Sequence, residues 1–271
     1  MNTLFIGAGS MACALMRGAL KSGALKKEDT YALNRSNEVR MKEIDEWFGV
    51  SKPGRGLSFD LVVLAMKPKD FDEAADVIRS HLSSQTVILS VLAGIPVSYI
   101  REKLGFLGGI ARAMPNTSAA LGKSATAVTL DRFGDRVMKE AVVHLLDSVG
   151  LTVEVEEHQL DLITALSGSG PAYIYYMAEM MQATAVELGL PSELARDLTI
   201  RTITGAGAML EESGLDAEEL RKNVTSPGGT TEAGIEALKA HGVEHALFEC
   251  ISSARNRSEE LGRKLIKTEK D

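Results

Sequence analysis

The chain has 271 residues, of which 45% are hydrophobic and 25% are charged. This composition is typical of a globular protein with one large domain or two smaller ones, and it excludes intrinsic disorder as the main description. The 30 Lys and Arg and the 37 Asp and Glu give a formal charge of −7 at pH 7. This charge argues against nonspecific binding to nucleic acid or to anionic membrane lipid.

The cysteines and the N-terminus indicate the compartment. Cys13 and Cys250 are too few for a disulfide framework and show no metal-ligand spacing with the five histidines, so we expect no structural metal. The first ten residues, MNTLFIGAGS, do not have the features of a signal peptide, and no apolar run reaches the length of a membrane span. We therefore expect a soluble cytoplasmic protein with neither a membrane nor a nucleic acid as partner.

Short aliphatic runs alternate with helix-like stretches in the first half of the chain. We expect strands at residues 3–6, 30–33, 61–65, 87–92, 109–113 and 125–129. Continuous apolar runs that alternate with helices are typical of a parallel sheet with helices on both faces. We therefore predict a doubly wound α/β domain over residues 1–157.

Apolar residues recur at helical spacing after about Glu157, so we predict an all-α domain over residues 158–271. Helices are expected at 171–188, from Pro191-Ser192 to Gly214, and then from Asp216, from Thr230 or Thr231, and from Val243. The helix at 171–188 is apolar around much of its circumference. It is either a central core helix or a surface shared with a second subunit, and we favour dimerisation.

A glycine-rich turn follows the first strand. Residues 7–12, GAGSMA, stand between a strand and a helix, as a dinucleotide-binding fingerprint requires. Gly7 permits the tight turn, Gly9 lets the backbone approach a pyrophosphate, and the small Ala12 lets helix and strand pack closely. The alternative is a tight turn without a ligand, which this position in the chain disfavours.

The end of the second strand distinguishes between cofactors. NAD enzymes place Asp or Glu there to bind the adenine ribose, whereas this chain has Asn34-Arg35-Ser36. Arg35 can pair with a 2′-phosphate, which predicts NADP over NAD, although a solvated loop arginine remains the alternative.

Two further strand ends are expected to line the ribose and the nicotinamide. Ligands of open α/β sheets bind beyond the carboxyl ends of the strands, which here carry residues 65–68 and 91–94. Lys67 is either a residue of this cleft or a surface lysine.

A second glycine-containing loop, residues 224–231, precedes a predicted helix. The first amide groups of that helix suit a carboxylate ligand. An ordinary helix N-cap is an equally good explanation of the loop alone.

Five blocks together closely resemble the pyrroline-5-carboxylate reductases: residues 7–11, 65–68, 112–117, 167–173 and 225–231. They stand in the family's order and spacing, and the resemblance covers nearly the whole chain. It implies hydride transfer from NAD(P)H to the C=N carbon of 1-pyrroline-5-carboxylate, which yields L-proline in the last step of proline synthesis. It also implies a Rossmann domain and a helical domain that binds substrate and interlocks with a second subunit, often within a larger ring of dimers.

The resemblance also implies the site residues. The family's cofactor contacts carry over to Ile6, Gly7, Ala8, Gly9, Ser10, Met11, Asn34, Ser36, Ala65, Met66, Lys67, Pro68, Val91, Leu92, Ala93 and Asn223. Its substrate-carboxylate contacts carry over to Ser226, Gly229, Thr230 and Thr231. Thr231 is also the candidate catalytic residue, with its hydroxyl near the ring nitrogen, and Glu157 falls where the family has a substrate-side carboxylate.

The chemistry of an imine agrees with this assignment. Reduction needs hydride delivery to carbon and a protonated or hydrogen-bonded nitrogen, and a cyclic imine is basic enough to arrive partly protonated. Placing the nicotinamide over the imine carbon therefore supplies most of the rate enhancement, and we hypothesise that Thr231 orients the ring nitrogen.

Three other functions compete with this assignment. β-Hydroxyacid dehydrogenases of similar architecture use a lysine on a helix of the second domain, and the helix that opens at Pro171 has none before Leu188. A noncatalytic NADP-binding regulatory protein would leave the loop at 226–231 without an evident purpose. A reductase of another cyclic imine remains open.

Overall fold

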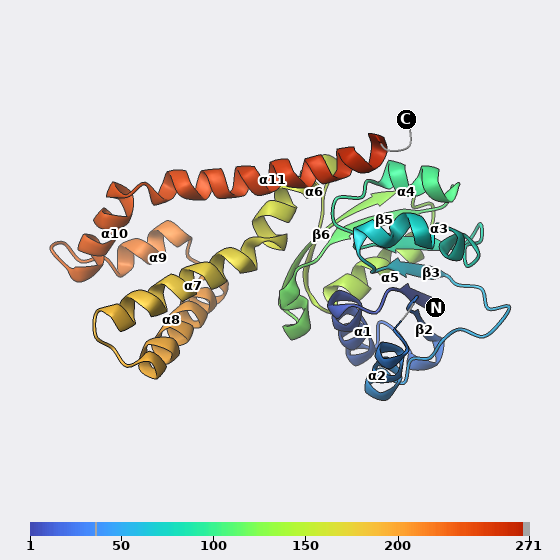
Figure 1. Ribbon diagram of the computed structural model, residues 1–271, viewed down its shortest axis with the longest axis horizontal. Helices are drawn as coiled ribbons and strands as arrows, with labels where there is room; N and C mark the ends of the chain where they lie inside the picture. The colour runs from blue at the N-terminus through green and yellow to red at the C-terminus, as the bar shows by residue number, and fades with distance from the viewer. Residues whose placement is uncertain (36, 268–271) are drawn as a thin grey trace. The chain divides into compact units, whose positions relative to one another are not determined.

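The computed structural model describes residues 1–35 and 37–267 (Figure 1). Within them, seven strands form one sheet in the order β2-β1-β3-β4-β5-β6-β7. The strands are β1 (Thr3–Ile6), β2 (Thr30–Leu33), β3 (Leu61–Leu64), β4 (Val87–Ser90), β5 (Ile110–Met114), β6 (Ser124–Asp131) and β7 (Gly150–Glu154). The first five strands pair in parallel with β1 between β2 and β3, which confirms the predicted doubly wound fold.

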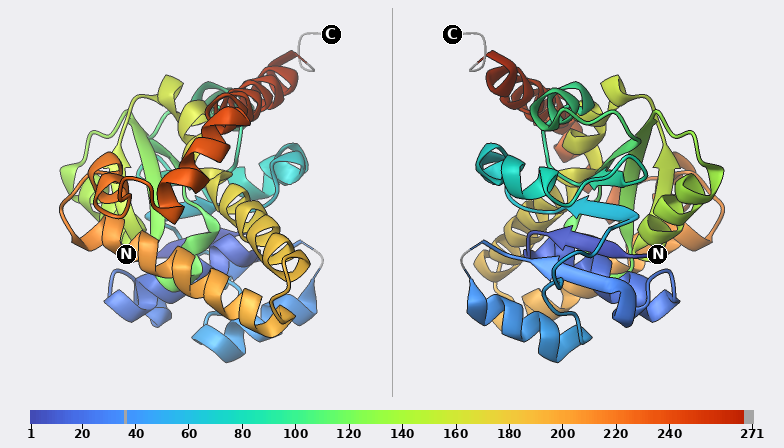
Figure 2. Two further views of the ribbon diagram at one scale, coloured as in Figure 1. Left: turned by 90° about the vertical axis from the view of Figure 1, so that its left-hand side faces the viewer. Right: turned by 90° about the vertical axis from the view of Figure 1, so that its right-hand side faces the viewer.

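Helices cover both faces of this sheet (Figure 2). They are α1 (Ser10–Ser22), α2 (Glu38–Phe48), α3 (Phe71–Arg79), α4 (Val97–Leu104) and α5 (Arg136–Asp147). Successive strand residues point to opposite faces, so β1 contributes to two separate cores. Phe5 packs in the core that α1, α2 and α5 cover, whereas Leu4 and Ile6 pack in the core that α3 and α4 cover.

Two details of the sheet differ from the sequence prediction. β6 runs antiparallel to β5, because η3 (Thr117–Leu121), the 3₁₀ turn between them, is too short for the crossover helix that a parallel pair needs. β7 was not predicted. Its partly and fully exposed residues alternate, as expected of an edge strand, so it lacks a continuous apolar run.

The remaining helices follow β7, as predicted for an all-α second half. They are α6 (Leu160–Ile163), the π-helical η5 (Thr164–Gly168), α7 (Gly170–Glu187), α8 (Ser192–Glu212), α9 (Ala217–Asn223), α10 (Thr230–Ala240) and α11 (Val243–Lys267). Asp216 caps α9 by accepting a hydrogen bond from the amide of Glu219, and Gly189 and Gly214 take positive φ after α7 and α8. In the part of the chain described, no helix is both long and apolar enough to cross a membrane.

Internal contacts divide the chain into two compact units. The first comprises residues 1–169 and 252–271, and the second comprises residues 170–251. Within the described residues 252–267, Ser258 Oγ donates to Asp161 Oδ1 at 2.6 Å, and a Cβ at Gly262 would lie 2.8 Å from the carbonyl oxygen of Gly94. These close approaches tie the segment to the first unit. The boundary expected between residues 157 and 158 remains a prediction about domain organisation.

Candidate active site

The glycine turn between β1 and α1 forms a cradle for a phosphate group. Gly7 has φ +109, and a Cβ there would lie 2.5 Å from the backbone of Ala65 and Met66, so only glycine fits. Gly9 is the N-cap of α1 and carries no side chain that could occupy the amide groups of the first turn. Exposed amides at the N-terminus of a helix bind anions, so the turn fits a pyrophosphate.

A cavity of about 470 Å³ lies beyond the carboxyl ends of β1, β2 and β3. Its lining combines apolar residues with three charged ones, of which Arg35 and Glu73 are mostly exposed and mark its mouth: Ile6, Gly7, Leu33, Asn34, Arg35, Met66, Asp70, Glu73, Ala74 and Val77. Apolar walls next to a phosphate cradle fit the adenosine half of a dinucleotide. Sequence analysis missed the contribution of α3, although a helix that directly follows a strand end is placed to line such a cavity.

Arg35 does not stand alone at the mouth of this cavity. Its guanidinium forms an ion pair with the Glu73 carboxylate, and both side chains are more than half exposed. Asn34 lines the same cavity, whereas Ser36 lies outside the described residues.

Arg40 ties α2 to the glycine turn. Its Nε donates to the carbonyl of Ala8 at 2.8 Å, Nη1 donates to Glu43 at 2.8 Å, and Nη2 contacts Cys13 Sγ at 3.2 Å. The Glu43 contact raises the pKa of the guanidinium, while burial raises the pKa of the Cys13 thiol. Arg40 therefore stabilises the conformation of the glycine turn, and short sequence motifs could not reveal this role.

The other expected cofactor segments follow β3 and β4. Ala65 is buried, Met66 lines the cavity and Lys67 is exposed at the N-cap of the 3₁₀ turn η2 (Pro68–Asp70). Leu92 is buried, and its neighbours Val91 and Ala93 are half-buried. Parallel strands end at the same edge of a sheet, so these segments share that edge with the glycine turn.

The second unit carries the loop at residues 224–229 and α10. The loop closes through Gly228, whose amide donates to Glu232 Oε2 at 2.7 Å, and through Gly229, whose amide donates to the Ser226 carbonyl at 3.0 Å. Gly228 adopts φ +70, which favours glycine. Ser226 and Thr230 are exposed, Gly229 and Thr231 are half-buried, and Asn223 ends α9 just before the loop.

Glu157 has structural partners in the first unit. Its Oε1 accepts hydrogen bonds from the amide of Val97 at 2.8 Å and from Arg112 Nη1 at 3.0 Å. Arg112 is 6% exposed and also lies 3.9 Å from Asp161. The carboxylate thus anchors α4 and neutralises a buried arginine, and its predicted contact with substrate is untested.

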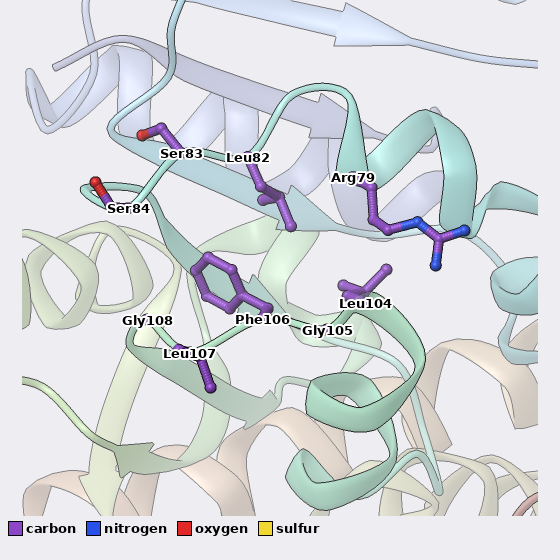
Figure 3. Close-up of a pocket in the computed structure, with 9 residues that line it drawn as sticks. All are labelled: Arg79, Leu82, Ser83, Ser84, Leu104, Gly105, Phe106, Leu107 and Gly108. Carbon is purple, nitrogen blue, oxygen red and sulfur yellow. The ribbon is translucent and has the colours of Figure 1, made fainter.

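Another cavity, of about 530 Å³, lies near the amino ends of β4 and β5 (Figure 3). Leu82, Leu104 and Phe106 give it an apolar lining, and the Arg79 guanidinium donates to the carbonyl of Lys103 at 3.0 Å. Ligands of this class of sheet bind at the carboxyl ends of the strands, so the cavity is not the cofactor site.

Comparison with known families assigns each half of the chain. The profile described as NADP oxidoreductase coenzyme F420-dependent matches residues 3–94, and the profile described as pyrroline-5-carboxylate reductase dimerisation matches residues 157–261. Together with the phosphate cradle at the sheet edge, these matches define a Rossmann-type oxidoreductase that uses a nicotinamide cofactor.

Individual relatives identify the family. Pyrroline-5-carboxylate reductase 2 of Bacillus subtilis is 44% identical over 262 residues, which cover 95% of this chain and 94% of the relative. The structure of a pyrroline-5-carboxylate reductase from Coxiella burnetii superposes with a TM-score of 0.88 at 34% identity, over 96% of this chain and 98% of that one. A Plasmodium falciparum pyrroline carboxylate reductase with NADP bound gives a TM-score of 0.82 at 25% identity, over 97% and 98%. The chain belongs to the pyrroline-5-carboxylate reductase family.

Proposed function

We propose that this protein reduces the C=N bond of 1-pyrroline-5-carboxylate to L-proline, the last step of proline biosynthesis, and prefers NADPH over NADH. The observation that carries the proposal is the 44% identity to a pyrroline-5-carboxylate reductase, because the match covers 95% of this chain and 94% of that relative.

The cofactor is assigned to the sheet edge of the first unit, and Asn223 is kept as a contact on the family resemblance alone. The proposed contacts are Ile6, Gly7, Ala8, Gly9, Ser10, Met11, Asn34, Arg35, Ala65, Met66, Lys67, Pro68, Val91, Leu92, Ala93 and Asn223, with Ser36 added from the sequence alone. The preference for NADPH rests on Arg35, which lines this cavity and whose planar guanidinium offers several N–H donors to a 2′-phosphate.

The substrate is assigned to the second unit. Ser226, Gly229, Thr230 and Thr231 surround the N-terminus of α10, whose amide groups favour a carboxylate. Glu157 is retained as a substrate-side carboxylate on the resemblance alone. The cofactor supplies a hydride to the imine carbon when bound. Thr231 holds the ring nitrogen in orientation through its hydroxyl, so that the nitrogen keeps its proton as the carbon is reduced.

We also assign substrate binding and dimerisation to residues 158–271, and we place the protein in the cytoplasm. The dimerisation profile over residues 157–261 supports an interface formed by the helices of this region. A ring of such dimers is the larger assembly that the family resemblance suggests.

The test is steady-state oxidation of NADPH and NADH by the purified protein with 1-pyrroline-5-carboxylate. We expect turnover with both cofactors and a higher kcat/KM with NADPH. Arg35→Gln should lower kcat/KM for NADPH by roughly tenfold, the value of one charge-assisted contact, and leave NADH nearly unchanged. Turnover that favours NADH would contradict the role of Arg35, and no turnover from a protein that binds NADPH would contradict the substrate.

Thr231 is tested in the same assay. Thr231→Ala should lower kcat/KM for the imine by roughly tenfold or more, and Thr231→Ser should restore much of it, because serine keeps the hydroxyl. An unchanged kcat/KM in the alanine variant would refute the orienting role.

A further inference from the structure

The mouth of the adenosine cavity carries opposing charges. Arg35 contributes the positive charge, while Asp70 and Glu73 contribute two carboxylates from the segment that begins α3. These three groups therefore give the mouth a net charge of −1.

A 2′-phosphate enters this mouth with up to two negative charges. The guanidinium that would receive it is already paired with Glu73, so the phosphate must compete with a carboxylate for Arg35. A 2′-hydroxyl carries no charge and can donate a hydrogen bond to a carboxylate. Glu73 thus opposes the phosphorylated cofactor and leaves the unphosphorylated one largely unaffected.

We propose that Glu73 is a specificity-determining residue that lowers the preference for NADPH over NADH by competing with the 2′-phosphate for Arg35. This inference rests on the proposed role of Arg35 in cofactor binding. It assigns a role to the two carboxylates that share the cavity lining with Arg35, where a 2′-phosphate is expected.

The test uses Glu73→Gln, which removes the charge and keeps the size of the side chain. Calorimetric binding of adenosine 2′,5′-bisphosphate and of adenosine 5′-monophosphate reports on the cavity without any turnover. Removing one carboxylate next to the phosphate should raise the selectivity for the bisphosphate by roughly three- to tenfold. The ratio of kcat/KM for NADPH to that for NADH should rise by a similar factor.

Asp76→Asn is the matched control. Asp76 lies on the same helix, pairs with Arg79 and does not line the cavity, so its loss removes the same charge without freeing Arg35. We expect both ratios to stay within about twofold of the unsubstituted protein in this variant.

The possible results separate this inference from the proposed function. Ratios that stay within about twofold in Glu73→Gln would overturn the inference, while turnover of 1-pyrroline-5-carboxylate by the same preparation would leave the proposed reaction intact. An equal rise of both ratios in Asp76→Asn would also overturn the inference, because the loss of any negative charge on this helix would then produce the same effect. A rise confined to Glu73→Gln supports the inference even if the imine is not reduced, and that absence of turnover would contradict the proposed reaction alone.

Discussion

The Gly9→Ala variant should bind NADPH more weakly while the stability of its fold stays nearly unchanged. Gly9 has φ −75, which any residue adopts, and a Cβ there would meet only the carbonyl of Ala65 at 3.9 Å, an ordinary contact. The free energy of unfolding should therefore change by less than about 0.5 kcal/mol. The new methyl group would nevertheless stand on the surface that a pyrophosphate must approach. Losing one charge-assisted hydrogen bond costs about 1.5–3 kcal/mol, which corresponds to a Kd for NADPH that is roughly 10- to 150-fold weaker.

Isothermal titration with NADPH and thermal unfolding of the free protein measure the two effects separately. Gly54→Ala is the control, because a Cβ at this loop position meets no atom within 4 Å, and both quantities should stay unchanged. Gly7→Ala is the contrasting variant: its Cβ would lie 2.5 Å from the backbone of Ala65, so it should reduce stability as well as binding. A Gly9→Ala protein that binds NADPH within about threefold of the original would refute the proposed approach of the pyrophosphate to this turn.

Two further predictions concern buried groups of the first unit. Burial raises the pKa of Cys13 above its ordinary 9.0, so the folded state keeps its proton longer than the unfolded state. The free energy of unfolding should therefore fall as pH rises above 9.0, by up to about 1.4 kcal/mol per pH unit. Denaturant titrations should show a smaller fall in the Cys13→Ala variant and an unchanged fall in the Cys250→Ala variant. An equal dependence of the unfolding free energy on pH in the Cys13→Ala variant and the original protein would contradict this. Arg112→Met should destabilise the protein by about 2–3 kcal/mol, because the buried bond to Glu157 is lost, while the exposed Arg136→Met should cost less than about 0.5 kcal/mol. Equal losses in these two variants would show that the buried bond contributes little.

The elements predicted from the sequence are those that local patterns determine. β1 and β2 have the predicted bounds, because each is a short apolar run next to a turn. The direction of β6 depends on the length of the connection from β5, and the existence of β7 depends on pairing with β6, so neither follows from a run of apolar residues. Sheet edges and connections are properties of the whole sheet.

The same distinction applies to the site. The glycine turn could be predicted because six consecutive residues specify it, and the cavity beside it contains Asn34 and Arg35, as expected from the end of β2. The contact from Arg40 to Ala8 spans 32 residues, and the Arg35–Glu73 ion pair joins segments that follow two different strands. No spacing rule connects such residues, so their influence on the cofactor site becomes visible only once the sheet brings them together.

The helical unit shows why association belongs to the proposed function. Of residues 170–251, all of which the structure describes, only Ala195 and Thr199 are buried, and α7 buries none of its side chains within the chain. Ordering a backbone costs about 1–2 kcal/mol per residue, which hydrophobic burial must offset. Apolar side chains of α7 remain substantially exposed, among them Ile174, Tyr175 and Met177. The dimerisation profile covers this same region, so the proposed second copy would provide the hydrophobic contacts that the helices of this unit lack within one chain.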